Sequence, residues 1–217
     1  GLILYAILYG AALYGVSVLL RSDPVTDYES VYRTAYALAS GGSVAYWDYF
    51  SMWTNNLNVL TILTCLMKIP LLAGGSDPYY FVLAMNVLQA MAVLVSLYYL
   101  AGKIGAKRYS VQWFTVILFT LWTPVWSSTN AFYSDQMSFG GGVIALAIYL
   151  YTSEKLQIQG FPKWFCLFGA GLLWGISASA KITAATAFIA LLILHILSGK
   201  KGFTKEFLFF ALIFVMT

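Results

Sequence analysis

Three ionisable side chains, those of Asp27, Asp135 and Lys181, are the groups in this sequence best placed to carry out chemistry. Only 9% of the residues are charged, and Asp135 and Lys181 stand at the ends of apolar runs, where a charge is expensive. A carboxylate can accept a proton or bind a metal ion, and a lysine can hold an anion as a point charge. These three residues are therefore the first candidates for a functional site.

The composition indicates a membrane protein. Hydrophobic residues make up 61% of the chain, the mean hydropathy is +0.80 and aromatic residues reach 18%, whereas a soluble domain of this size would carry far more charge. Several nearly uncharged stretches have the length of about 20 residues that a helix needs to cross a bilayer. We expect an all-α fold, a polytopic transmembrane helical bundle. The bases lie in loops between apolar runs, so the net charge of +4 gives no reason to expect nucleic acid as a partner.

The apolar runs define how the chain is organised. They cover approximately residues 2–20, 56–73, 79–101, 110–127, 136–152, 164–180, 182–198 and 207–217. Because the chain begins and ends inside such runs, we expect residues 1–217 to be a single transmembrane domain, cut at both ends, from the N-terminal part of a longer protein.

Basic residues predict which breaks between runs face the cytoplasm. They gather in the breaks 102–109, 153–163 and 199–206, and the positive-inside rule assigns such breaks to the cytoplasmic side. The break 123–134 contains no Lys or Arg and is expected outside. Lys181, between two short runs, is expected outside or in the outer half of the membrane.

The long polar loop 21–55 can lie on either side. If the runs 56–73 and 79–101 both cross the membrane, the loop is cytoplasmic and far from Asp135. If they make one crossing together, the loop lies outside, on the same face as Asp135. Pro70 and the following Gly-rich break would allow a bent or partly horizontal element, and the charges alone leave both arrangements open.

The loop 21–55 is predicted to contain a helix at the membrane surface. Thr26-Asp27-Tyr28-Glu29 fits a capping box, with Thr26 as N-cap and Glu29 reaching back. The helix would run to about Ser40 and stop at Gly41-Gly42. One stripe of it would carry Tyr28, Tyr32, Ala35 and Tyr36, which suits a membrane interface.

Three motifs occur in an order that resembles a known family. The first is Tyr49-Phe50-Ser51-Met52-Trp53-Thr54-Asn55-Asn56, between the acid-rich loop and an apolar run; Trp53-Thr54 stands where a Tyr-Pro would be expected. The others are Phe132-Tyr133-Ser134-Asp135, similar to a Tyr-x-Asp motif, and the run Gly175-Ile176-Ser177-Ala178-Ser179-Ala180-Lys181. In this order they resemble the GT-C glycosyltransferases, membrane enzymes that use polyprenyl-phosphate sugars and include protein mannosyltransferases and the aminoarabinose transferase. The resemblance extends over nearly the whole chain.

The resemblance implies an inverting transferase with its active site on the outer face of a bacterial cell membrane. The donor would be a polyprenyl-phosphate sugar, and the acceptor a cell-envelope polymer, glycolipid or protein. Asp27 would be the general base, and Asp135 a second acid that orients the acceptor or joins a metal site. Lys181, assisted by Arg33, would bind the donor phosphate. Further candidates for substrate binding are Tyr49, Trp53, Asn55 and Asn56. The resemblance makes no cofactor certain, and a divalent metal ion is left open.

Structural roles and other functions compete with this interpretation. Asp27 and Asp135 could be acids that stabilise helix N-termini, and Lys181 could extend from a helix end to the membrane surface. The aromatic residues around Trp53 could form an interfacial belt. The alternative functions are a membrane transporter or lipid-linked-sugar flippase without glycosyl transfer, and a non-catalytic membrane assembly subunit.

Overall fold

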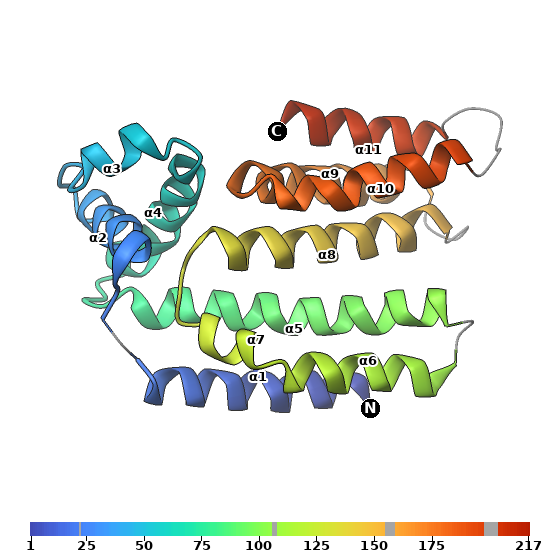
Figure 1. The fold of residues 1–217 in the computed structure, drawn as a ribbon, viewed down its shortest axis with the longest axis horizontal. Helices are drawn as coiled ribbons and strands as arrows, with labels where there is room; N and C mark the ends of the chain where they lie inside the picture. The colour runs from blue at the N-terminus through green and yellow to red at the C-terminus, as the bar shows by residue number, and fades with distance from the viewer. Residues whose placement is uncertain (22, 106–107, 155–158, 198–203) are drawn as a thin grey trace.

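The apolar runs fold as helices, because only a helix satisfies its own backbone hydrogen bonds in apolar surroundings. The computed structural model describes residues 1–21, 23–105, 108–154, 159–197 and 204–217, and these form helices and no strand (Figure 1). The helices are α1 (Leu2–Leu19), α2 (Thr26–Ala39), α3 (Trp47–Met52), α4 (Asn56–Leu72), α5 (Tyr79–Ile104), α6 (Tyr109–Leu121), α7 (Thr123–Ser128), α8 (Ser134–Glu154), α9 (Phe161–Ala180), α10 (Thr183–Leu197) and α11 (Lys205–Met216).

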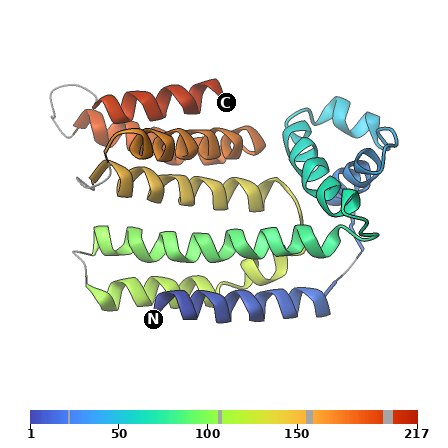
Figure 2. The same ribbon diagram turned by 180° about the vertical axis from the view of Figure 1, so that it is seen from behind.

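The helices form a bundle with a separate group at one end. Helices α1, α5, α6, α8, α9, α10 and α11 lie side by side with similar axis directions (Figures 1 and 2). Helices α2, α3 and α4 form what we call the cap, at the end of the bundle where α5, α8 and α10 begin. The other end, where α6, α9 and α11 begin, we call the basic end because Lys103, Arg108, Lys163 and Lys205 belong to it.

The position of α4 distinguishes between the two arrangements of the long loop. Helix α4 packs against α2 in the cap, whereas α5 runs along the bundle from the cap to the basic end (Figure 1). The two apolar runs therefore make one passage along the bundle, as the second arrangement requires. Helix α4 ends where the sequence predicts a break: Gly74 has φ +86, and the Gly75 amide donates to the carbonyl of Pro70 at 2.9 Å.

Two of the described helices, α1 and α5, are long and apolar enough to cross a membrane. Large apolar side chains also point outward from several bundle helices. Examples more than 50% exposed are Leu4, Leu8, Phe114, Leu118, Phe165, Ile189, Leu208 and Leu212. Soluble monomers rarely leave so much apolar surface open to water, so this outer surface fits an apolar surrounding.

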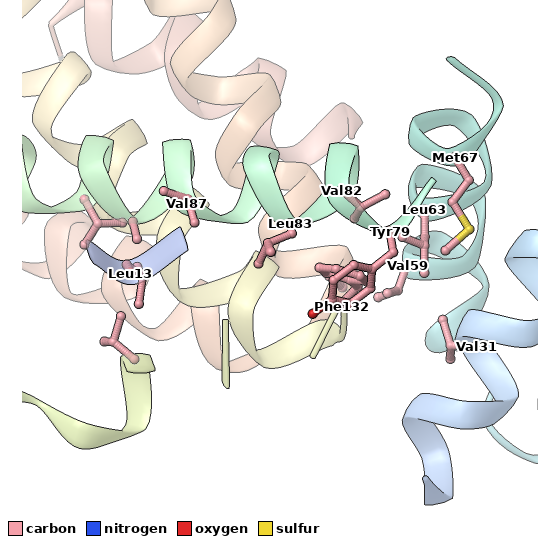
Figure 3. Packing of buried hydrophobic residues seen from close by; sticks show 14 of the residues in the cluster. Leu13, Val31, Val59, Leu63, Met67, Tyr79, Val82, Leu83, Val87 and Phe132 are labelled. Atoms are coloured by element: carbon pink, nitrogen blue, oxygen red, sulfur yellow. The ribbon is translucent and has the colours of Figure 1, made fainter. Parts of the chain in front are cut away.

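The cap is attached to the bundle through an aromatic contact. Phe132, which is 5% exposed, lies 5.6 Å from Tyr79 of α5 and 6.1 Å from Tyr28 and Tyr32 of α2, measured between ring centres. Figure 3 shows Phe132 beside Tyr79, with Val59 of α4 close by. Burying a side chain of this size contributes about 1.5–3 kcal/mol, so Phe132 fixes the segment before α8 against the cap.

Small residues let α8 and α9 approach closely. A Cβ atom added to Gly141 of α8 would lie 1.8 Å from Ser177 Oγ of α9. Helix α9 also approaches α11 closely, since a Cβ atom added to Gly175 of α9 would lie 3.0 Å from the carbonyl oxygen of Phe214. Close approach of this kind is the usual role of small residues between membrane helices. It brings the C-terminal end of α9 next to the first turn of α8.

The helix in the long loop is confirmed, but the predicted capping box is wrong. Helix α2 begins at Thr26 with Val25 as its N-cap and no side-chain cap bond, and Thr26 itself has φ +56. Glu29 does not reach back, because its carboxylate accepts a hydrogen bond from Arg33 Nε at 2.7 Å. The predicted end is correct: Ser40 is the C-cap, and Gly41 follows with φ +84.

Candidate functional site

A hydrogen-bond network joins all three cap helices to the segment before α8. The Asn56 Nδ2 atom, at the start of α4, donates to Tyr49 Oη of α3 at 2.6 Å and to Tyr133 Oη at 3.0 Å. The two tyrosine hydroxyls are 3.1 Å apart, and Tyr133 Oη donates to Asp27 Oδ2 of α2 at 3.4 Å. Residues from four separate parts of the chain therefore meet at Tyr133.

The direction of these hydrogen bonds follows from what each group can donate. Tyr133 uses its proton for the Asp27 carboxylate, so the contact between the tyrosines must be donated by Tyr49. Desolvation on burial, followed by the hydrogen bond with Tyr133, raises the pKa of Tyr49 above its ordinary value, so this hydroxyl keeps the proton it donates. The side-chain oxygen of Asn56, Oδ1, accepts a hydrogen bond from Asn55 Nδ2 at 3.3 Å. The network thus runs from Asn56 to Asp27.

The network combines a buried core with an exposed carboxylate. Asn56 is only 2% exposed, whereas Asp27 is exposed. The contact between Tyr133 and Asp27 is also the longest in the network and near the limit for a hydrogen bond. The hydrogen bond from Tyr133 therefore orients Asp27 from inside the cap, while the carboxylate remains exposed at the surface.

The packing around the network fixes Tyr133. Its neighbour Phe132 stacks on Tyr32, with the ring planes at 27°, and meets Tyr28 edge to face. Burial raises the pKa of Tyr32 to about 12 and that of Tyr28 further. Two residues of the tyrosine stripe predicted on α2, Tyr28 and Tyr32, thus hold the segment 132–133 through Phe132.

Asp135 and Lys181 form an ion pair at the same end of the bundle. Lys181 Nζ donates to Asp135 Oδ1, and their side chains are 40% and 67% exposed. Asp135 lies in the first turn of α8, and Lys181 is the extended residue that separates α9 from α10, with φ −155 and ψ 120. The Lys181 carbonyl accepts from Ser138 Oγ at 3.4 Å, so its backbone is also tied to α8.

Two cavities adjoin Asp135. One, of about 290 Å³, lies between α5, α6, α7 and α8 and has aromatic walls that include Phe119, Trp122 and Phe139. The other, of about 330 Å³, lies between α8 and α10 and contains hydroxyl groups, those of Ser138, Thr183 and Thr186. A ligand with an apolar part and a polar part could occupy such a pair of spaces on either side of the carboxylate.

The network and the ion pair are neighbours but form two clusters. Tyr133 and Asp135 are two residues apart, and Asn58 Nδ2 donates to the Ser179 carbonyl at 3.5 Å, which ties α4 to the end of α9. Asp27 does not line either cavity beside Asp135. The three ionisable residues predicted to act together therefore share one end of the molecule, and Ser134 separates Tyr133 of the network from Asp135 of the ion pair in the sequence.

Arg33 and Trp53 lie away from the ion pair. Arg33 is paired with Glu29 and lines a separate cavity of about 160 Å³ together with Arg21, Tyr28 and Tyr32. The one-turn spacing to Glu29 engages the Arg33 guanidinium within α2, and Lys181 does not line this cavity. Trp53 follows α3 and is 54% exposed. Among the described residues, no three Asp, Glu, His or Cys side chains gather into a group that could hold a metal ion.

Several polar contacts at this end were not predicted. Tyr133 was part of a motif but had no assigned role. Asn86 Nδ2 and Gln89 Nε2 of α5 donate to the carbonyls of Thr129 and Gln136 at 3.0 and 2.9 Å, which holds the connection between α7 and α8. Two amide side chains in an otherwise apolar run were the available signal, since polar groups there seek partners on neighbouring helices.

Comparison of the chain with protein-family models, with curated proteins and with solved structures gave no match.

Proposed function

We propose that this chain is the transmembrane part of a GT-C type glycosyltransferase. It transfers a sugar from a polyprenyl-phosphate donor to a cell-envelope acceptor on the outer face of the membrane. The observation that carries the proposal is the meeting of the three sequence motifs at one end of the bundle. The first motif supplies Tyr49 and Asn56, the second Tyr133 and Asp135, and the third Lys181.

The distribution of charge supports the assignment of this end to the outer face. Eight of the 12 Lys and Arg residues fall in the sequence breaks 102–109, 153–163 and 199–206, and the described ones among them, Lys103, Arg108, Lys163 and Lys205, belong to the basic end. Six of the eight acids belong instead to the cap or to helix starts beside it: Asp23, Asp27, Glu29, Asp48, Asp77 and Asp135. The positive-inside rule then puts the basic end in the cytoplasm.

In the proposed reaction, Asp27 acts as the general base. An acceptor hydroxyl attacks the anomeric carbon, and its proton moves to the Asp27 carboxylate as the new C–O bond forms. The bond from that carbon to the phosphate oxygen breaks on the opposite side, and the electron pair leaves with the lipid phosphate, so the configuration is inverted. The cation of Lys181 stabilises the charge on the departing phosphate.

The test is sugar transfer by the purified protein in its complete natural chain, with Asp27→Asn compared against Asp48→Asn. Asp48 is another exposed acid of the cap and has no place in the site. Loss of the general base should lower turnover by about 10²- to 10⁴-fold, while Asp48→Asn should leave turnover unchanged. Turnover at the wild-type rate in Asp27→Asn would remove Asp27 from the mechanism.

A transporter or flippase is the second candidate, and the extended break at Lys181 is the observation that favours it. Discontinuous helices beside a charged residue are common at transport sites. The two functions differ in their products. A glycosyltransferase releases polyprenyl phosphate and forms a new glycosidic bond, whereas a flippase returns the lipid-linked sugar intact on the other side of a vesicle membrane.

A further inference from the structure

The ion pair between Asp135 and Lys181 carries no net charge, because the carboxylate neutralises the ammonium. The Lys181 ammonium is already in contact with the Asp135 carboxylate, and both side chains remain substantially exposed, at 40% and 67%. A lipid phosphate that binds Lys181 must therefore either join this pair or replace the carboxylate. The charges favour replacement, because two anions close to one ammonium would repel each other.

The pair is built so that its side-chain contact can open without disturbing the fold. The backbone of Lys181 is held independently, since its amide donates to Ser177 at 3.1 Å and its carbonyl accepts from Ala184 at 3.0 Å and from Ser138. Ion pairs this exposed contribute little to stability. The polyprenyl phosphate released after transfer is a monoester with up to two negative charges and three acceptor oxygens, so it competes well against a single carboxylate.

We propose that Asp135 occupies Lys181 in the resting protein and that the phosphate of a polyprenyl-phosphate lipid takes its place on binding. This inference rests on the proposed function and adds a regulatory role for Asp135 at the same site. The carboxylate keeps the lysine from binding smaller anions with full strength. When released, it can turn toward the hydroxyl-lined cavity of Ser138, Thr183 and Thr186, which it already borders.

The test is equilibrium binding of a short-chain polyprenyl monophosphate to the purified protein in phosphatidylcholine nanodiscs. No sugar is transferred in this assay, so it does not depend on catalysis. Asp135→Asn should bind the lipid phosphate about two- to fivefold more tightly than wild type, because it removes a competitor of the strength of an exposed ion pair. Lys181→Met should bind it about tenfold more weakly or worse, because a hydrogen bond to a charged group is lost.

The double variant Asp135→Asn/Lys181→Met identifies the cause of any tightening. It should bind like Lys181→Met alone, because Asp135 acts only through the lysine; continued tightening would show a general charge effect and would overturn the exchange. Asp48→Asn, which changes the net charge equally at an exposed site in the cap, should bind like wild type. Inorganic phosphate should follow the same order with lower affinity, whereas the uncharged polyprenol should not distinguish the variants. A polyprenol that follows the same order would also contradict the proposal.

The outcomes separate this inference from the function on which it rests. If wild type binds the lipid phosphate and Lys181→Met weakens binding, but Asp135→Asn does not tighten it, only the exchange is wrong. If wild type does not bind the lipid phosphate, the role of Lys181 as the phosphate-binding residue of the proposed function is wrong. Each variant should elute as wild type does in size-exclusion chromatography, which shows that the comparison concerns folded protein.

Discussion

At the scale of single residues, Asn56 determines the geometry of the cap network. It is almost fully buried, and both hydrogens of its side-chain amide are used, one for Tyr49 and one for Tyr133. Leaving a buried polar group without a hydrogen-bond partner costs more stability than one hydrogen bond contributes, because nothing then compensates for the desolvation of that group. The residue therefore affects stability as well as the position of Asp27.

We predict that Asn56→Leu destabilises the protein by about 1–3 kcal/mol, because two tyrosine hydroxyls lose their donor in a buried place. Asn58→Leu is the matched control. Asn58 stands two residues later on α4, is exposed and makes one contact, at 3.5 Å, so its replacement should change stability by less than about 0.5 kcal/mol. Thermal unfolding in detergent measures both. Equal effects would mean that the network is not a stabilising unit.

Tyr133 is expected to act as a positioning residue for Asp27. In Tyr133→Phe the ring stays and the hydrogen bond to Asp27 is lost, so turnover should fall about tenfold while KM for the acceptor changes little. Tyr46→Phe, an exposed tyrosine beside α3, should leave both constants unchanged. An equal rise in KM without a fall in kcat would show that Tyr133 binds substrate instead.

At the scale of helices, the contact between α8 and α9 sets the distance between Asp135 and Lys181. Gly141→Ala would put a methyl group 1.8 Å from Ser177 Oγ, so either this hydroxyl gives up its hydrogen bond to the Leu173 carbonyl or the helices separate, and we predict a loss of about 1–3 kcal/mol. Gly169, also helical, has nothing within 4 Å of its Cβ position. Gly169→Ala should be neutral or stabilise by up to about 1 kcal/mol. Thermal unfolding distinguishes the two, and a Gly141→Ala protein as stable as wild type would contradict the close packing.

The sequence predicted the elements better than their arrangement. Long uncharged runs identify the helices because a backbone in apolar surroundings must satisfy its own hydrogen bonds, and Gly41-Gly42 marked the end of α2, where Gly41 adopts the left-handed conformation. The start of α2 was mispredicted because Thr26 can cap a helix only from an extended conformation, which Val25 adopts instead. The meeting of Asn56, Tyr49 and Tyr133 depends on contacts between residues up to 84 positions apart, which no local pattern specifies.

At the scale of the whole molecule, one arrangement explains both the charge pattern and the site. Helix α4 has a length and composition close to those of a membrane span, and charge counts alone cannot say whether it crosses. Its place in the cap leaves α1 and α5 to run in opposite directions along the bundle (Figure 2). All three basic breaks then fall at one end, and the cap, the α7–α8 connection and Lys181 fall at the other.

This arrangement predicts which single cysteines react with a membrane-impermeant reagent in intact cells. The background must lack Cys65 and Cys166, of which the first is exposed; both can be replaced by serine. Ser43→Cys in the cap and Ser127→Cys in α7 should react, because both positions are exposed at the cap end. Ser110→Cys, exposed at the start of α6 at the basic end, should react only after the cells are opened.

The three positions together decide the sidedness, because each rejected arrangement gives a different pattern. If α4 crossed the membrane as well as α5, the cap and the α7–α8 connection would lie on opposite sides, and only one of Ser43→Cys and Ser127→Cys would react from outside. If the orientation were reversed, Ser110→Cys alone would react. Reaction at both cap-end positions but not at Ser110→Cys is the pattern expected when the Asp27 network and the Asp135–Lys181 pair face the same compartment, as the proposed function requires.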